Sequence, residues 1–159
     1  MFTQTDYSGT RSEQYTMLGK QLDALLTGES NQIANLSNAS ALLNQFLERI
    51  NWAGFYLMED GELVLGPFQG LPACVRIQVG KGVCGTAASE KKTMLVKDVH
   101  AFPGHIACDA ASRSEIVIPL IKGGEVIGVL DIDSPELSRF TEEDQEGLEN
   151  FTAILMKHL

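Results

Sequence analysis

The chain has 159 residues, of which 44% are hydrophobic and 21% charged, as expected for one soluble globular domain with a substantial core. The net charge of −9 argues against nucleic acid, because phosphate recognition needs a basic surface, and it also disfavours anionic lipid. A cationic or zwitterionic ligand fits this charge better. No apolar run approaches the ~18 residues of a transmembrane helix, so we expect no membrane association through a spanning segment.

The cysteine count and the N-terminus point to the cytoplasm. Residues 1–6 have neither the basic start nor the apolar core of a secretory signal. Three cysteines are an odd number for the disulfide framework of a secreted protein. We therefore expect a cytoplasmic protein, in which loop cysteines are more often catalytic or metal-binding than structural.

Two amphipathic helices are predicted near the N-terminus. After a polar arm at residues 1–12, apolar residues recur at steps of three and four from Ser12 to about Leu26. The same pattern runs from Gln32 to Arg49, after a turn at residues 27–31. These helices would either cover one face of a sheet or pair two copies of the chain in a homodimer, and the sequence does not separate these arrangements.

From Trp52 the hydrophobic period changes to two, which predicts strands. Six are expected, at residues 52–58, 63–68, 73–79, 93–98, 113–121 and 125–133. Residues 80–89 should form a glycine-rich turn that runs into a short helix of small residues. A closing helix should begin at Thr141, because the acidic residues that follow suit a helix N-terminus. The order predicts a single α+β domain over residues 1–159, with a mostly antiparallel central sheet flanked by N- and C-terminal helices.

Cys108 is the candidate nucleophile. It lies in a long predicted loop at residues 99–112, beside Asp109 and three residues after His105. The reactive species of cysteine is the thiolate, whose chemistry follows local charge and exposure. Cys74 and Cys84 lie in stretches punctuated by glycine and proline, and we expect none of the three inside an apolar helix or strand, where structural cysteines usually lie. Three unrelated, inert cysteines are the alternative.

Three acids should line one face of the last hairpin. Glu115, Asp131 and Asp133 occupy alternating positions in two strands that are rich in valine and isoleucine. Inward acids are costly unless they bind something, so we expect them to hold a ligand ammonium, with one carboxyl kept protonated by its neighbours. The alternative for these acids, and for Asp109, is a solvated charge at a strand end.

Five motifs together resemble the free methionine-(R)-sulfoxide reductases, which are stand-alone GAF-domain enzymes. They are Trp-x-Gly-Phe-Tyr at 52–56, Gly-Pro-Phe-Gln-Gly at 66–70, Gly-x-Gly-Val-Cys-Gly-Thr-Ala at 80–87, His-Ile-Ala-Cys-Asp at 105–109 and Gly-Val-Leu-Asp-Ile-Asp-Ser at 128–134. The match spans about residues 51–140, and the terminal helices also suit the family. GAF domains at large usually lack this cysteine set, so the three cysteines and the Asp131-x-Asp133 pair carry the specificity.

The resemblance implies reduction of free L-methionine-(R)-sulfoxide by thiol chemistry, without cofactor or metal. It assigns attack on the sulfoxide to Cys108 and makes Cys74 the preferred resolving thiol, with Cys84 as an alternative or auxiliary one. A sulfenic acid on Cys108 would condense with a thiol whose Cα lies within about 7 Å, and thioredoxin would reduce the resulting disulfide.

The substrate side of the expected site combines acids and aromatic rings. Glu115, Asp131 and Asp133 would hold the ammonium and the sulfoxide oxygen, in a division that stays open. Trp52 and Tyr56 are four residues apart on one strand, hence on one face, and would wall the S-methyl group, although ordinary core aromatics would show the same spacing.

Three other functions fit parts of the sequence. His105 with the three cysteines gives a Cys₃His count suitable for zinc, but the paired short spacings of zinc sites are missing. A ligand-sensing GAF module without catalysis would normally be fused to an output domain, for which this length leaves no room. A thiol peroxidase or a reductase of protein-bound methionine sulfoxide is the third, although a pocket that demands a free ammonium should exclude peptides.

Overall fold

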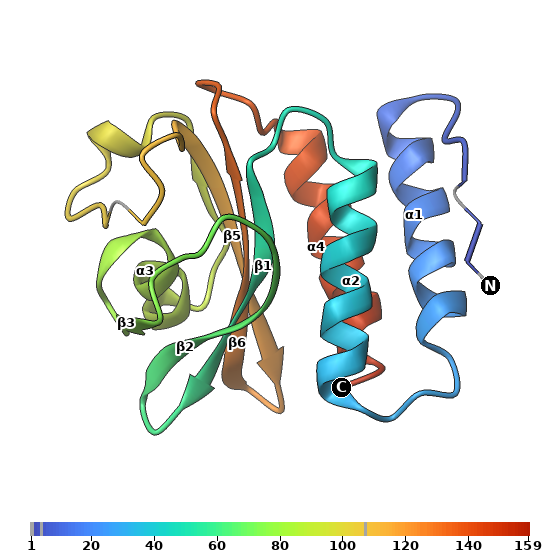
Figure 1. Ribbon diagram of the computed structural model, residues 1–159, viewed down its shortest axis with the longest axis horizontal. Coiled ribbons are helices and arrows are strands. Elements are labelled where there is room, and N and C mark those ends of the chain that lie inside the picture. Colours follow the sequence, from blue (N-terminus) through green and yellow to red (C-terminus); the bar gives the residue numbers. More distant parts are fainter. Residues whose placement is uncertain (1, 4, 107) are drawn as a thin grey trace.

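An antiparallel sheet divides the molecule, and each face carries its own layer of helices or loops (Figure 1). The computed structural model describes residues 2–3, 5–106 and 108–159. In this part of the chain six strands follow the order β3-β2-β1-β6-β5-β4, and all neighbouring strands are antiparallel. Their bounds are β1 Trp52–Glu59, β2 Glu62–Gly70, β3 Arg76–Gln78, β4 Met94–Val96, β5 Ser114–Lys122 and β6 Glu125–Ser134. The predicted α+β class is confirmed.

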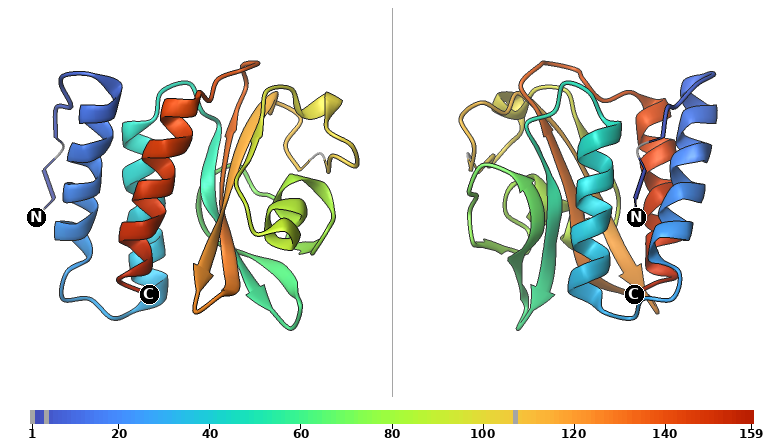
Figure 2. Two further views of the ribbon diagram at one scale, coloured as in Figure 1. Left: turned by 180° about the vertical axis from the view of Figure 1, so that it is seen from behind. Right: turned by 45° about the vertical axis from the view of Figure 1, so that its right-hand side comes forward.

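Helices cover both faces of the sheet (Figures 1 and 2). The helices are α1 Arg11–Leu26, α2 Gln32–Phe46, α3 Gly82–Glu90 and α4 Glu142–Met156, with a 3₁₀ turn, η1, at Val99–Ala101. Helices α2 and α4 contact the sheet, and α1 packs on their outer side. Helix α3 lies on the opposite face. None of the helices in the described residues is both long enough and apolar enough to cross a membrane.

Of the two arrangements predicted for the N-terminal helices, α2 adopts the first, since it covers β1 and β2. The outward side of α1 is polar and exposed, with Ser12, Glu13, Thr16, Lys20 and Asp23. Part of the N-terminal arm is held, because the Tyr7 ring packs edge-on against Phe46 at 4.7 Å and its hydroxyl donates to Gln21. A homodimer therefore stays a prediction that this packing does not address.

The pleat of β5 and β6 separates an apolar face from an acidic one. Ile116, Ile118, Leu130 and Ile132 point toward the helices and join the larger core. The alternate positions point toward α3, and the register pairs Glu115 with Asp133 and Val117 with Asp131. Because side chains alternate along a strand, a register shift of one residue would bury these acids in the core.

Several element bounds differ from the predictions, most of all those of the second helix and the third strand, and the predicted strand at 93–98 is shortened to β4. The second helix ends at Phe46 rather than Arg49, because Leu47 is extended and Arg49 adopts a positive φ of 58°. The third strand is confined to Arg76–Gln78, because only the first residues of β2 pair with it. The preceding residues leave the sheet and turn over its α3 side, which places Cys74 near the loop of Cys108.

A buried carboxylate fixes the start of α4 against α1. Asp144 is 2% exposed and accepts hydrogen bonds from the Tyr15 hydroxyl at 2.7 Å and the Arg139 guanidinium at 3.2 Å. It also completes a capping box with Thr141, as its position in the sequence predicted. Burial alone would raise the pKa of Asp144, but these hydrogen bonds, with the charges of Arg139 and Arg11, outweigh burial and lower it.

The α1–α4 contact depends on a glycine. A Cβ built on Gly147 would lie 2.2 Å from the Tyr15 ring, whose hydroxyl Asp144 holds in place. We predict that Gly147→Ala lowers the free energy of unfolding by about 1–3 kcal/mol despite the better helix propensity of alanine. Gly19→Ala is the matched control, since its Cβ meets only the flexible ends of the Ile154 and Asn150 side chains. Urea unfolding that shows equal stability for both variants would contradict this view of the interface.

Candidate active site

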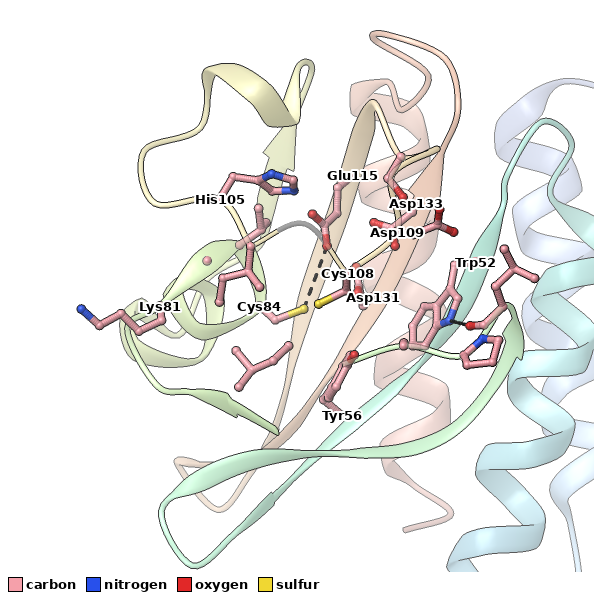
Figure 3. A pocket seen from close by; sticks show the side chains of 18 residues that line it. Trp52, Tyr56, Lys81, Cys84, His105, Cys108, Asp109, Glu115, Asp131 and Asp133 are labelled. Carbon is pink, nitrogen blue, oxygen red and sulfur yellow. Dashed lines mark hydrogen bonds between the residues drawn. The ribbon is translucent and has the colours of Figure 1, made fainter. Parts of the chain in front are cut away.

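A pocket lies between the acidic face of the sheet and three segments that close over it (Figure 3). Strands β1, β5 and β6 form its floor. Its walls come from residues 71–73, the start of α3, residues 105–106 and residues 108–109. Every site residue predicted from the sequence lines this pocket except Cys74. These lining residues are Trp52, Tyr56, Cys84, Cys108, Asp109, Glu115, Asp131 and Asp133.

Cys74 reaches the site through a disulfide with Cys108. The two Cα atoms are 5.4 Å apart, within the range that a disulfide permits, although the residues are separated by 34 positions. Both cysteines are partly exposed at the edge of the pocket. With these sulfurs bonded to each other, the alternative Cys₃His zinc site is not formed.

Cys84 differs from the other two cysteines, because it lies in the short helix of small residues expected within residues 80–89. It belongs to the first turn of α3 and is 4% exposed. Its Sγ lies 4.0 Å from Oε2 of Glu115. Burial raises the pKa of the Cys84 thiol, and the negative charges of Asp131 and Glu115 raise it further, so this cysteine favours the neutral thiol.

The sequence suggested a turn at Cys84 because of the surrounding glycines. Gly85 serves a close approach instead, since a Cβ there would lie 2.3 Å from the carbonyl oxygen of Gln78. The glycine lets the helix begin directly against β3, which brings Cys84 over the carboxyl cluster.

Three carboxyl groups meet on the floor of the pocket. Glu115 and Asp131 are 7% and 6% exposed, and Asp133 is half-buried beside them. Burial raises the pKa of Glu115 and of Asp133, and the charge of Asp131 adds to both shifts. Burial also raises the pKa of Asp131, against the hydrogen bonds that it receives from Glu115 and Cys84. The cluster therefore retains protons that a bound cation would displace.

One carboxylate oxygen in this cluster has no partner. Oδ1 of Asp131 is fully buried and accepts no hydrogen bond from the described residues. Ligand atoms of Cys84, Glu115 and Asp131 lie within 4.8 Å of one another, so these three residues are the group that could hold a metal ion. A ligand ammonium would satisfy the same oxygen, because it carries three donors and a positive charge.

An aromatic wall closes the side of the pocket toward β2. The Trp52 ring stacks between those of Tyr56 and Phe68, at centroid distances of 5.8 and 5.1 Å. The Trp52 Nε1 donates to the carbonyl of Leu71 at 3.1 Å, and the Tyr56 hydroxyl donates to the carbonyl of Cys74 at 2.8 Å. Burial raises the pKa of Tyr56 and keeps it a donor. The wall therefore also positions the segment that carries Cys74.

Sequence reasoning missed Asn51 and Ser112. The Asn51 Nδ2 donates to Oδ2 of Asp109 at 2.9 Å and to Oγ of Ser112 at 3.1 Å. Both acceptors line the pocket, whereas Asn51 lies behind them. No periodicity marks a polar residue at the entry of a strand, so only its position just before Trp52 offered a signal.

His105 also lines the pocket. Burial and the neighbouring His100 lower its pKa, against the opposing charge of Asp131. A neutral imidazole supplies no positive charge to stabilise a thiolate on Cys108.

Comparison with known proteins places this architecture in a family. A GAF domain model matches residues 18–156. A curated relative, the free methionine-R-sulfoxide reductase of Escherichia coli, is 56% identical over 149 residues, which cover 94% of this chain and 90% of the relative. The chain belongs to the GAF-domain family of free methionine-R-sulfoxide reductases.

A further relative and two solved structures support membership of the same family. The free methionine-R-sulfoxide reductase of Saccharomyces cerevisiae is 48% identical over 143 residues, which cover 85% of this chain and 79% of the relative. The structure of fRMsr of Staphylococcus aureus in its reduced form has a TM-score of 0.90 and 56% identity, and the match covers 98% of this chain and 99% of that one. The free methionine-R-sulfoxide reductase of Neisseria meningitidis in complex with its substrate gives a TM-score of 0.94 at 42% identity, covering 99% and 95%.

We predict that removing an acidic group from the carboxyl cluster stabilises the folded protein. The folded pKa of Glu115 is raised above its unfolded value, so the unfolded chain loses a proton that the folded chain keeps as pH rises above about 4.3. The free energy of unfolding therefore falls between that pH and the folded pKa. We expect Glu115→Gln to raise the melting temperature at pH 7–8 and to match the wild type near pH 4.

The control for this experiment is Glu125→Gln, an exposed position at the start of β6 with the same change of charge. Calorimetry on the disulfide form should show little effect there. If Glu115→Gln melts at or below the wild type at pH 8, Glu115 is held by compensating contacts that the pocket does not reveal.

Proposed function

We propose that this GAF domain reduces free L-methionine-(R)-sulfoxide to methionine. The observation that carries the proposal is the Cys74–Cys108 disulfide at the edge of a pocket with buried carboxyl groups, in a chain 56% identical to a named reductase of this substrate. A zwitterionic amino acid supplies the cation that the carboxyl cluster lacks. A peptide-bound methionine sulfoxide has no such ammonium, so it should bind poorly.

In the first step the Cys108 thiolate attacks the sulfoxide sulfur. The S–O bond breaks, methionine leaves as the thioether, and the oxygen, which takes a proton from a carboxyl group of the cluster, ends on Cys108 as a sulfenic acid. The sulfoxide sulfur is thereby reduced and Cys108 oxidised, each by two electrons. A protonated carboxyl group near the oxygen would assist by donating a hydrogen bond to it, and the raised pKa values of Glu115 and Asp133 support this role.

In the second step the Cys74 thiolate attacks the sulfenic sulfur of Cys108. Water leaves and the Cys74–Cys108 disulfide forms, which is the state that the structure contains. The 5.4 Å separation of the Cα atoms supports Cys74 as the resolving residue. We assign Cys84 an auxiliary role, because its burial and raised pKa make it the poorer nucleophile.

We propose that substrate recognition is divided between two sides of the pocket. Asp131, Glu115 and Asp133 hold the ammonium and the sulfoxide oxygen, and Asp109 contributes at the rim next to Cys108. Trp52 and Tyr56 wall the S-methyl group, since sulfur and its methyl pack favourably against aromatic rings. Their stacked, buried rings support a rigid wall of this kind.

The recycling partner belongs to the same proposal. A dithiol reductant of the thioredoxin type would open the disulfide, and the partial exposure of both cysteines supports its access. A disulfide that forms and opens in each cycle is compatible with a cytoplasmic location, where lasting disulfides are rare. We further propose that residues 1–159 form one GAF domain, and that two copies pair as a homodimer through the terminal helices.

The cysteine roles are tested by single-turnover release of methionine from reduced, desalted protein. Cys108→Ser should release none, because no thiolate remains to attack the sulfoxide. Cys74→Ser should release one methionine per chain and then stall with thioredoxin as reductant, because its sulfenic acid finds no resolving thiol.

Cys84→Ser is the matched control and should turn over repeatedly. Steady turnover of Cys74→Ser with thioredoxin would move the resolving role to Cys84. Turnover by Cys108→Ser would overturn the assignment of the nucleophile.

A further inference from the structure

The loop that carries Cys108 has few attachments to the rest of the fold. Between η1 and β5, the described residues 103–106 and 108–112 form coil and turns. Their backbone hydrogen bonds are local, such as His105 to Phe102 and Ser112 to Asp109. The disulfide is therefore a major link between this loop and the body of the molecule, and the proposed reaction requires that link to be open when substrate reacts.

One side chain links the loop to the sheet independently of the disulfide. The Asn51 amide donates one hydrogen bond to Asp109 and another to Ser112, which is 5% exposed. Among the hydrogen bonds of residues 103–112 in the described part of the chain, these two alone reach the sheet. They flank the turn that immediately follows Cys108.

Asn51 is itself firmly held. Its backbone N–H donates to the carbonyl of Asp133 at 2.9 Å, and it directly precedes Trp52 on β1. Asn51 therefore lies next to both Asp133 on the floor of the pocket and Trp52 in its wall. A displacement of the Asn51 amide would move the Cys108 loop relative to both.

The oxygen atom of the Asn51 amide is unusual. Its Oδ1 is buried and accepts no hydrogen bond from the described residues, which costs free energy in an ordinary structural asparagine. The amide is thus oriented by its donor side, toward the carboxylate of Asp109.

We propose that Asn51 is a positioning residue, which keeps the Cys108 loop aligned with the pocket while the Cys74–Cys108 disulfide is open. The inference rests on the proposed function, because it assigns Asn51 a role in the reduced state that attacks the sulfoxide. In the disulfide form the covalent bond holds the loop, so Asn51 is dispensable there. A misplacement of the nucleophile by about 1 Å can lower a rate by about 100-fold.

The first test uses Asn51→Asp, which keeps the size of the side chain and removes its donors. Reduced Asn51→Asp should release methionine about 10- to 100-fold more slowly than reduced wild type in a single turnover, with KM changed by no more than about threefold. Asn51→Ala should show a similar loss. Asn38→Ala, an exposed asparagine of α2, is the matched control and should react at the wild-type rate.

The second test does not depend on activity. Hydrogen exchange of residues 103–112 in Asn51→Ala should equal the wild type in the disulfide form and exceed it at least about tenfold in the reduced form. If this variant does not fold, Ser112→Ala removes one of the two bonds and should give a smaller effect of the same kind.

The two tests separate the inference from the function on which it rests. A reduced wild type that releases no methionine would contradict the proposed function. The exchange measurement would still test whether the hydrogen bonds of Asn51 hold the Cys108 loop. A wild-type rate in Asn51→Asp, or faster exchange in both redox states, would overturn the positioning role. The latter result would show that Asn51 only stabilises the fold.

Discussion

The burial of three carboxyl groups on one face of a hairpin is the constraint on which this structure depends. Strand alternation places Glu115, Asp131 and Asp133 together and sends the intervening isoleucine and leucine residues into the opposite core. Carboxylates that are buried together disfavour folding, because their charges repel one another unless a cation compensates them. The large core between the sheet and helices α1, α2 and α4 offsets this cost, together with a second cluster of buried apolar residues on the α3 side that includes Val83, Val117 and Val129.

The two faces of the sheet therefore have different tasks. The helical face supplies stability, with close contacts such as Gly147 against Tyr15 and a buried Asp144 that joins α1 to α4. The other face carries shorter elements, including α3, η1 and the loop of Cys108, and these hold polar and reactive groups. A thiol that must alternate between a free and a bonded state needs such a surrounding, since a tightly packed core would not allow Cys74 and Cys108 to separate.

Much of the fold and the site was predictable from the sequence, because its strongest signals are periodic. The alternation of Glu115, Asp131 and Asp133 and the spacing of Trp52 and Tyr56 placed these side chains on one face, and the structure places them in one pocket. The helix around Cys84 was less predictable, because its glycines indicate turns unless the close approach to Gln78 is known. Asn51 was missed, since its role depends on a contact with Asp109 across 58 positions.

The substrate selectivity of the wild-type protein shows whether the carboxyl cluster binds an ammonium group during catalysis. We expect dithiothreitol-reduced protein to release methionine from free methionine-R-sulfoxide and not from the S epimer or the N-acetylated R form. We expect no turnover of the N-acetylated form because it lacks the ammonium group, from which a buried oxygen of the carboxyl cluster would accept a hydrogen bond. Equal turnover of the N-acetylated compound would contradict the ammonium site, and no turnover of any of the three would contradict the catalytic assignment and favour a ligand-binding GAF domain.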